Sequence, residues 1–330
     1  MRVFPGYQME GLTKKVCEKL GTEPGKIEYH KFSDGELLPQ VLQSVHGKRV
    51  FLIMSFHSSD SIIANYLALM ALRRSHATLI PVISYYGYGR QDRKDRRGVP
   101  ISAKDIAELV CMCEPEDVVI LDPHNRSIEG YFKRTSLLYG SFVLITAMKK
   151  HLNEAGYNTE VMPERIVQVA PDDGRVEYNN FYAKGLGIKL VLHCKKITLG
   201  NNKKEVIFTD TRLPKNAVVA MSDDLIDTFG TIYNGTNAIN AMSQQLYGSD
   251  CSAFFISGTH GRFSGSAIEK ISKSRIQKVI VTDSIPELQE RCEKISTVSI
   301  VPVLAEAIRR IHNHESISDM FGTNWTEMLP

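Results

Sequence analysis

Short apolar runs alternate with amphipathic segments along almost the whole chain. Runs rich in valine and isoleucine, each bounded by polar residues, predict buried strands in the first half at 49–56, 78–86 and 117–122. Between these runs, apolar residues recur at helical spacing over 61–77 and 102–113, and Ser102 is suited to cap the second helix. Strands that alternate with helices in this way favour parallel sheets with helices on both faces.

The second half repeats this scheme. Its apolar runs predict strands at 165–170, 189–194, 217–222, 252–257 and 278–283, with helices at 231–247 and 265–273. A polar stretch near 145–160 separates the two halves. We therefore expect an α/β protein with two similar domains, each a mainly parallel sheet flanked by helices. Ligands of such sheets bind at the carboxyl ends of the strands.

Composition excludes several classes of protein. The 330 residues are 43% hydrophobic and 23% charged, which suits two globular domains. The apolar runs are too short to cross a bilayer, and the first residues lack the apolar core of a secretory signal. A net charge of +3 without a long basic block argues against nucleic acid, and six cysteines form no zinc or redox pattern. We expect a cytoplasmic protein with neither a membrane nor a nucleic-acid partner.

The strongest chemical signal is VVAMSDDLIDTFGT at 218–231. An apolar strand is expected to end at two carboxylates, and a turn with hydroxyls and a glycine then enters a helix. Backbone amides and hydroxyls at a helix start bind a phosphate monoester, and carboxylates accept hydrogen bonds from sugar hydroxyls. The plain alternative is a helix cap beside a solvated acidic turn. The residues concerned are Asp223, Asp224, Asp227, Thr228, Phe229, Gly230 and Thr231.

This segment resembles the ribose-phosphate loop of the type I phosphoribosyltransferases, which usually ends Asp-Thr-small-Gly-Thr. Other segments are similar to the ribose-phosphate pyrophosphokinases, or PRPP synthetases, and together they cover nearly the whole chain. They are KFSDGE at 31–36, YYGYGRQDRKDRRGVPISAK at 85–104, DPHNRSIEGYF at 122–132, GTHGRFSGSAIEKI at 258–271 and AEAIRRIHNHESIS at 305–318.

The resemblance implies an Mg²⁺-dependent enzyme with a phosphoribosyltransferase-like fold. It would move the β,γ-diphosphate of ATP to the anomeric hydroxyl of ribose 5-phosphate, giving PRPP and AMP. Such chemistry depends on positioning and charge neutralisation, and the chain has no Walker loop. The resemblance also implies an ATP-binding domain at 1–146, a ribose-phosphate-binding domain at 147–303, and a segment, 304–330, that packs back on the first domain. A homodimer that assembles into a hexamer is expected.

Roles follow from the resemblance position by position. The adenine would be received by a neighbouring subunit's Phe32, Asp34 and Glu36, and ATP would also meet Arg90, Gln91 and Asp95. Taken alone, FSDGE is an ordinary turn, and the basic cluster from Arg90 is a solvated face. His124 would contact ATP and, together with Asp172, hold Mg²⁺; a lone loop histidine is otherwise merely solvated. The transferred diphosphate would lie on the turn Asp172, Asp173, Gly174 and Arg175.

Several positions depart from the family pattern. The family usually has Ala and Gly where Asp173 and Arg175 stand, and leucine at Pro123. Cys194 occupies the position of the family's catalytic lysine, so Lys195 or Lys196 would supply that cation instead. His124 is the other residue that the resemblance implies to be catalytic. Phe229 replaces a small residue, and its ring either packs beneath the loop or changes the volume around the sugar phosphate. Regulatory arginines of the family are absent near His46 and Gly98, which argues against that allosteric site.

These departures leave alternatives open. The same chemistry on a larger acceptor such as ADP-ribose is motivated by Phe229 and the rewritten diphosphate loop. A non-catalytic paralogue that regulates an active synthetase is favoured by Cys194 but disfavoured by the acidic loop and His124. A phosphoribosyltransferase that consumes PRPP has no reason to carry FSDGE or RQDRKD.

Overall fold

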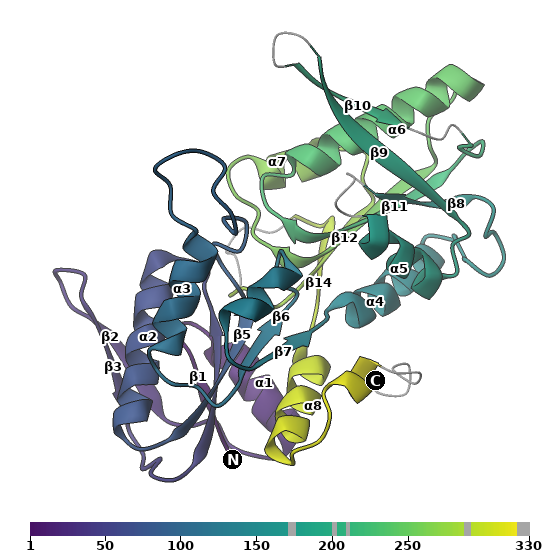
Figure 1. The fold of residues 1–330 in the computed structure, drawn as a ribbon. Helices are drawn as coiled ribbons and strands as arrows, with labels where there is room; N and C mark the ends of the chain where they lie inside the picture. Colours follow the sequence, from purple (N-terminus) through teal and green to yellow (C-terminus); the bar gives the residue numbers. More distant parts are fainter. Residues whose placement is uncertain (171–175, 200–202, 209–211, 287–291, 322–330) are drawn as a thin grey trace. The chain divides into compact units, whose positions relative to one another are not determined.

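The computed structural model describes residues 1–170, 176–199, 203–208, 212–286 and 292–321, without the side chains of 195–199 and 203–208. The chain divides into two compact units (Figure 1). The first unit comprises residues 1–140, 284–286 and 299–330, and the second comprises 141–283 and 287–298. Each unit is an α/β structure with its own sheet and core, as the alternating pattern predicts.

The first unit contains a five-stranded parallel sheet in the order β1-β4-β5-β6-β7. Its strands are β1 (Arg2–Pro5), β4 (Arg49–Ser55), β5 (Thr78–Tyr85), β6 (Val118–Leu121) and β7 (Thr135–Leu138). Its helices are α1 (Glu10–Leu20), α2 (Ser59–Arg74), α3 (Ser102–Cys111) and α8 (Val301–His312), with short 3-10 helices η1 (Arg126–Tyr131) and η4 (Ser318–Phe321). A separate antiparallel hairpin joins β2 (Ile27–Lys31) to β3 (Leu37–Val41).

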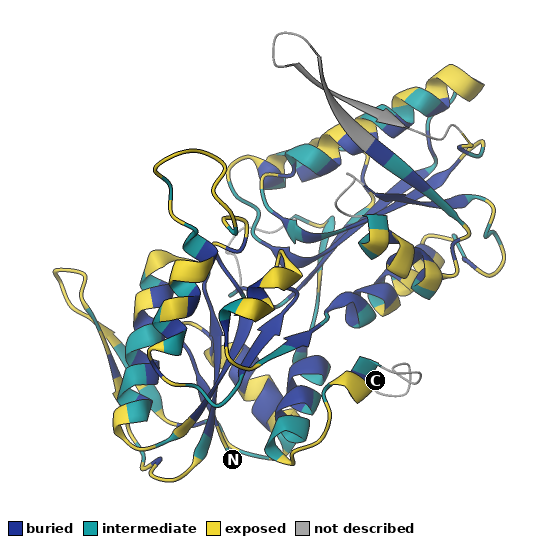
Figure 2. Cartoon of the chain, in the orientation of Figure 1, coloured by how far each residue is buried: buried dark blue, intermediate teal, exposed yellow. Residues whose placement is uncertain are grey.

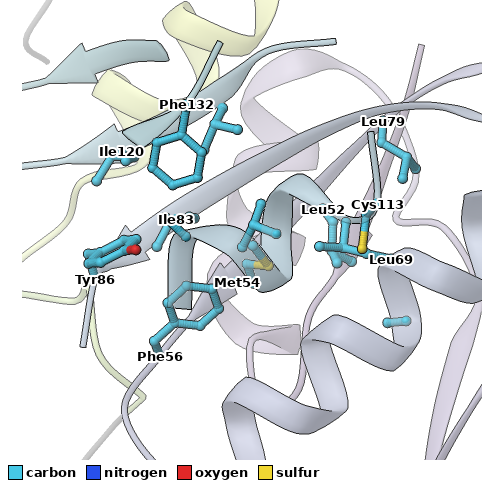
Figure 3. Close-up of a cluster of buried hydrophobic side chains, with 14 of the residues drawn as sticks. Leu52, Met54, Phe56, Leu69, Leu79, Ile83, Tyr86, Cys113, Ile120 and Phe132 are labelled. Atoms are coloured by element: carbon cyan, nitrogen blue, oxygen red, sulfur yellow. The ribbon is translucent and has the colours of Figure 1, made fainter. Parts of the chain in front are cut away.

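Local sequence explains where these elements begin and what they bury. Ser58 and Ser61 form a reciprocal capping box that fixes the start of α2. Strands β4 and β5 are buried over nearly their whole length because helices cover both faces (Figure 2). Their side chains join those of α2 and β6 in one core, where Leu52, Leu69 and Ile120 lie in the same cluster (Figure 3).

The C-terminal helix belongs to the first unit, where α8 packs against α1 (Figure 1). One face of α8 is apolar and buried. Arg49, at the start of β4, donates to the last carbonyls of the helix, those of Ile311 and His312, each at 3.2 Å. The same guanidinium forms an ion pair with Glu116. A cation at a helix C-terminus satisfies carbonyls that lack partners within the helix, so Arg49 fastens α8 to the sheet.

The second unit contains a seven-stranded sheet in the order β10-β9-β8-β11-β12-β13-β14, parallel except for β10 at one edge. The strands are β8 (Ile166–Ala170), β9 (Leu190–Leu199), β10 (Lys203–Phe208), β11 (Val218–Ile226), β12 (Ala253–Gly261), β13 (Lys278–Thr282) and β14 (Ile295–Val298). Alternate residues of β11 face opposite cores. One core holds α4 (Ser141–Glu154) and α5 (Val176–Leu186), and the other holds α6 (Gly230–Tyr247) and α7 (Ala267–Lys273).

Several local predictions are wrong. The strands expected at 189–194 and 252–257 continue to Leu199 and Gly261 as β9 and β12. The strand expected to end at Asp223 and Asp224 continues to Ile226, because its last residues still pair with β12, so both acids lie inside β11. Ser102 does not cap α3: Ile101 precedes the helix, and the Ser102 hydroxyl instead donates to Oε1 of Gln91 at 2.6 Å. Among the described residues, no helix has both the length and the hydropathy needed to span a membrane.

Candidate functional site

In the first unit, the loop after β5 rests on three aromatic rings. Tyr86 directly follows the strand, and its ring meets those of Phe56 and Phe132 edge-on at centroid distances of 5.6 and 6.3 Å (Figure 3). The Tyr86 hydroxyl donates to the carbonyl of Ala103 at 2.7 Å, and burial raises its pKa, so the hydroxyl keeps its proton. These contacts hold both ends of the loop, 86 and 103, on a rigid base.

Glycines let this loop pass close to its neighbours. A Cβ on Gly87 would lie 1.9 Å from the carbonyl oxygen of Phe56, so only glycine fits there without movement. A Cβ on Gly89 would lie 3.5 Å from the Cβ of His124, which places the backbone of the loop beside the histidine. The segments YYGYGRQ and DPHNRS, 30 residues apart in the sequence, therefore meet at the carboxyl edge of one sheet.

Asp92 links these two segments, although its part was not foreseen. Its Oδ2 accepts from Nδ2 of Asn125 at 2.6 Å, and its carbonyl accepts from the Tyr131 hydroxyl at 3.2 Å. Asn125 also caps η1 by accepting from the amide of Ser127 at 3.0 Å. Asp92 thus holds the loop after β5 against the loop that carries His124. The signal was present within RQDRKD, but one acidic residue among basic ones does not reveal its partner.

The predicted ATP-binding residues of this loop are placed unequally. Arg90 and His124 are exposed at the edge where the two segments meet. Gln91 is engaged in holding α3, because its carbonyl accepts from the amide of Ala103 at 3.1 Å and its side chain accepts from Ser102. Asp95 is exposed further along the loop, with Arg96 Nε 3.9 Å away. Arg90 and His124 are therefore the candidates best placed for a ligand at this edge.

The residues expected to receive the adenine lie at the tip of the β2–β3 hairpin, which projects beside α2 (Figure 1). The tip is a tight turn in which the amide of Phe32 donates to the carbonyl of Glu36 at 2.9 Å, and Asp34 accepts from the amide of Glu36 at 3.1 Å. All three residues are exposed, and the Phe32 ring is 51% exposed. The turn is therefore preformed, and it presents an aromatic side chain to solvent.

In the second unit, the acidic residues lie along the last part of β11. Successive residues of a strand point to opposite faces, so Asp223 and Asp224 leave the strand on opposite sides. Asp224 is buried, whereas Asp223 and Asp227 are partly exposed. Asp223 accepts from the amide of Asp224 at 2.9 Å, and its carbonyl accepts from the hydroxyl of Tyr178 on α5 at 3.1 Å. Asp223 and Asp224 thus lie on opposite faces of the sheet, and Asp227 follows the end of the strand.

The turn between β11 and α6 has an exposed backbone and a buried ring. Thr228 is exposed, and its carbonyl accepts from Nζ of Lys270 on α7 at 3.4 Å. Phe229 precedes the first residue of α6, Gly230, and its ring is buried beneath the turn. The first amides of any helix lack an acceptor within that helix, and for this reason a helix N-terminus is suited to an anion. Of the two orientations considered for Phe229, the structure adopts the one beneath the loop.

A buried polar network supports this edge from inside the sheet. Ser222, next to Asp223, exchanges a hydrogen bond with Ser257 of β12 at 2.9 Å. Gln168 of β8 donates to Asn179 of α5 at 2.7 Å and to Ser222 at 3.2 Å, and Asn179 donates to the carbonyl of Ser222 at 3.0 Å. All four side chains are buried, so each bond is costly to lose. Serines inside apolar strands give little signal in a sequence, and these residues were missed.

Some predicted residues cannot be placed. Asp172, Asp173, Gly174 and Arg175 lie outside the described residues, and Lys195 and Lys196 are described only as backbone within β9. Cys194, which precedes these lysines, is fully buried in the core with α6 and α7. Among the described residues, no group of three His, Cys, Asp or Glu side chains is arranged to hold a metal. The roles of these residues and of Mg²⁺ stay predictions.

Comparison with known proteins identifies the family of the chain. A model of the N-terminal domain of ribose phosphate pyrophosphokinase matches residues 1–113, and one of the phosphoribosyl synthetase-associated domain matches residues 214–322. The ribose-phosphate pyrophosphokinase of Porphyromonas gingivalis is 34% identical over 323 residues, 97% of each chain. This chain belongs to the ribose-phosphate pyrophosphokinase family.

Other members of the family agree. The ribose-phosphate pyrophosphokinase of Helicobacter pylori is 32% identical over 324 residues, 97% of this chain and 96% of its own. The crystal structure of the phosphoribosylpyrophosphate synthetase from Mycobacterium smegmatis matches with a TM-score of 0.82 at 26% identity, covering 95% of this chain and 99% of that one. The predicted α/β fold of the family is therefore confirmed, and the alternatives of another acceptor or a regulatory paralogue gain no support.

Proposed function

We propose that this protein is a ribose-phosphate pyrophosphokinase that transfers the β,γ-diphosphate of ATP to the anomeric hydroxyl of ribose 5-phosphate. The bond between the α- and β-phosphates of ATP breaks, the sugar oxygen bonds to the β-phosphorus, and AMP leaves. The observation that carries the proposal is the match to ribose-phosphate pyrophosphokinases along the whole chain. The site residues support it: in the second unit the turn after β11 combines the start of α6 with Asp227, and in the first unit Arg90 and His124 lie at the carboxyl edge of the sheet.

In this proposal each group has a separate task. Arg90 binds a phosphate of ATP through its planar guanidinium, and Asp227 accepts hydrogen bonds from the ribose hydroxyls. The amides at the start of α6 bind the 5-phosphate. His124 and Asp172 would hold Mg²⁺, which would neutralise charge on the diphosphate when bound. His124 suits this task because it is exposed at the carboxyl end of β6, two residues after the buried Asp122, whose Oδ2 accepts from the amide of Gly140 at 2.8 Å.

The exposed hairpin tip supports a further part of the proposal. Phe32, Asp34 and Glu36 form an exposed turn that is held by its own hydrogen bonds. We propose that this tip receives the adenine in the site of a second copy, so that the active form is an oligomer. A cytoplasmic location is proposed on the family resemblance, together with the six cysteines, all of which are free thiols.

The buried ring of Phe229 removes one of the two reasons for an alternative acceptor; the other, the rewritten diphosphate loop at 172–175, lies outside the described residues. A larger acceptor such as ADP-ribose was attractive because an exposed ring would stack on its adenine. The ring is 3% exposed and packs in the core, so it offers no stacking face. Cys194 is likewise a core residue, which makes its difference from the family lysine weak support for a non-catalytic paralogue.

The test is AMP release, measured by chromatography, from Mg·ATP with either ribose 5-phosphate or ADP-ribose. AMP with ribose 5-phosphate, together with PRPP, is the expected result. AMP with ADP-ribose alone would replace the acceptor, and no AMP with either sugar would favour the regulatory paralogue.

Asp227→Ala tests the ribose site. Loss of hydrogen bonds to a charged group costs about 1.5–3 kcal/mol each, so we expect kcat/KM for ribose 5-phosphate to fall at least about tenfold. Glu269→Gln is the matched control, because Glu269 is an exposed acid on α7 that pairs with Lys273 at 2.7 Å. Equal kinetics for Asp227→Ala and the wild type would exclude Asp227 from the site.

His124→Ala tests the nucleotide site. We expect a fall in kcat/KM for Mg·ATP of at least about tenfold, with little change in KM for ribose 5-phosphate, because removal of a direct ligand contact costs roughly 1.5 kcal/mol or more. His76→Ala, at an exposed histidine beyond α2, is the control. Wild-type turnover of His124→Ala at saturating Mg²⁺ would show that the assignment is wrong.

A further inference from the structure

Phe229 has a backbone conformation that side chains rarely adopt. It precedes the first residue of α6 with φ 64° and ψ 4°, in the left-handed region. A Cβ crowds the backbone in this region, so a bulky non-glycine residue stays there only when its surroundings hold it. The position lies in the turn proposed to bind the phosphate of the acceptor. Contacts elsewhere in the chain must therefore hold Phe229 in the left-handed conformation.

Burial of the Phe229 ring is the first contact that holds this conformation. The ring is buried in the core cluster below the turn, together with Ile226 at the end of β11 and Ile232 in the first turn of α6. The carbonyl of Phe229 accepts from the amide of Tyr233 at 3.0 Å, so the residue also starts the helix. Burial of an aromatic ring is strongly favourable and is lost if the backbone turns the ring outward.

A second loop locks the same turn from the side. The amides of Arg262 and Phe263 both donate to the carbonyl of Ile226, at 2.8 and 3.1 Å. Phe263 is also left-handed, with φ 51°, and its ring packs against the same core cluster. A Cβ on Gly261 would lie 2.7 Å from this ring, and one on Gly258 would lie 2.6 Å from Ile226, so both glycines give the room that the interlocked loops need.

We propose that Phe229 is a positioning residue for the phosphate of the acceptor, acting through the anchorage of its ring. This inference rests on the proposed function. The buried ring holds residue 229 left-handed, and this conformation sets the direction of the first amides of α6 at the proposed phosphate site. Without the ring, residue 229 relaxes toward the right-handed region. Phosphate binding must then return it to the left-handed conformation. The cost then falls on the binding of ribose 5-phosphate.

Steady-state kinetics of Phe229→Ala test this proposal. We expect KM for ribose 5-phosphate to rise about tenfold, the equivalent of 1.4 kcal/mol, with KM for Mg·ATP changed less than about twofold. Phe229→Leu, which keeps an apolar side chain in the core, should restore KM to within about threefold of the wild type. The matched control is Ile239→Val, a milder cut in the same core cluster further along α6. It should leave both KM values unchanged.

Hydrogen exchange of the free protein gives a readout that does not depend on turnover. In Phe229→Ala, amides of 227–233 should exchange about tenfold faster, while those of 253–258 in β12 stay as in the wild type. If Phe229→Ala does not fold, Phe229→Leu takes its place, with a rise in KM and in exchange of about threefold expected at the turn alone.

The outcomes separate the two hypotheses. A wild type that releases no AMP with ribose 5-phosphate overturns the proposed function, and the exchange experiment still judges the anchorage. An active Phe229→Ala whose KM for ribose 5-phosphate is unchanged, or whose two KM values rise together, overturns the positioning role. Faster exchange throughout the second unit, equal at the turn and in β12, also overturns it, because that result describes a general loss of stability.

Discussion

Gly87 is the residue at which the fold of the first unit most directly constrains the proposed ATP site. It follows β5 and Tyr86, and a Cβ placed on it would lie 1.9 Å from the carbonyl oxygen and 3.0 Å from the carbonyl carbon of Phe56. Phe56 is itself held there, because its amide donates to the carbonyl of Tyr85 at 2.9 Å. In Gly87→Ala, backbone must therefore move away from backbone, and a side-chain rotation cannot relieve the contact.

The magnitude follows from two terms. Overpacking in a rigid interior costs about 1–3 kcal/mol, and weakening of the Phe56 to Tyr85 hydrogen bond adds about 1 kcal/mol. A loss of about 3 kcal/mol lowers the midpoint of thermal unfolding by about 6–12 °C in a domain of 150–250 residues. The movement also shifts Gly89 and Arg90, so we expect KM for Mg·ATP to rise about fivefold or more while KM for ribose 5-phosphate changes little.

Thermal unfolding followed by circular dichroism, together with steady-state kinetics, checks both numbers. Gly11→Ala is the control: Gly11 lies inside α1 with no atom within 4 Å of an added Cβ, so this change should stabilise the protein by about 0.5–1 kcal/mol. If Gly87→Ala unfolds within a degree of the wild type, the close contact with Phe56 is wrong. If its midpoint falls but KM for Mg·ATP stays constant, the loop after β5 does not bind ATP.

Two further predictions follow from burial in the second unit. Cys194→Lys should not restore a catalytic lysine but should destabilise the protein by several kcal/mol, because residue 194 is fully buried in an apolar cluster. Cys194→Ala should lower the free energy of unfolding by only about 1–2 kcal/mol. Urea unfolding of both variants checks this difference. Burial lowers the pKa of His151, which contacts Ser296 at 3.1 Å and Glu154 at 3.1 Å, so the folded state prefers the neutral ring. The stability from this neutral ring is fully present above the ordinary histidine pKa of about 6.5 and is lost as pH falls below that value. From pH 7 to pH 5, the urea midpoint of the wild type should therefore fall more than the urea midpoint of His151→Asn.

The architecture could be predicted from the sequence because the signals for parallel strands are strong. Strands such as β4, β5 and β6 are buried on both faces, and apolar runs of this kind are not expected in loops. The end of β11 was missed because the acids after Ser222 are poor strand formers, and pairing with β12 overrides that preference. The antiparallel hairpin that carries FSDGE was also missed, since its strands are largely exposed and give no apolar pattern.

The candidate site, like the fold, could be predicted only in part from the sequence. Residue types and family patterns were enough to select Arg90, His124 and the turn at 227–231. They could not show that Gln91 is already engaged by Ser102, or that Asp92 joins its loop to Asn125, because both depend on loops that meet only in the fold. Whether the selected residues bind ATP and ribose 5-phosphate depends on ligands and stays a prediction.

Both units support their polar loops by the same physical arrangement, although they share little sequence. In each, an aromatic residue at the carboxyl end of a central strand buries its ring below a loop that carries polar groups: Tyr86 after β5 and Phe229 after β11. In each, a glycine leaves room for a neighbour to come close, Gly87 for the carbonyl of Phe56 and Gly258 for Ile226. An anion-binding loop cannot pack through its own polar groups, because these must stay available to the ligand. Apolar anchorage from below leaves those groups available and still fixes the backbone, which is the condition for catalysis that depends on positioning.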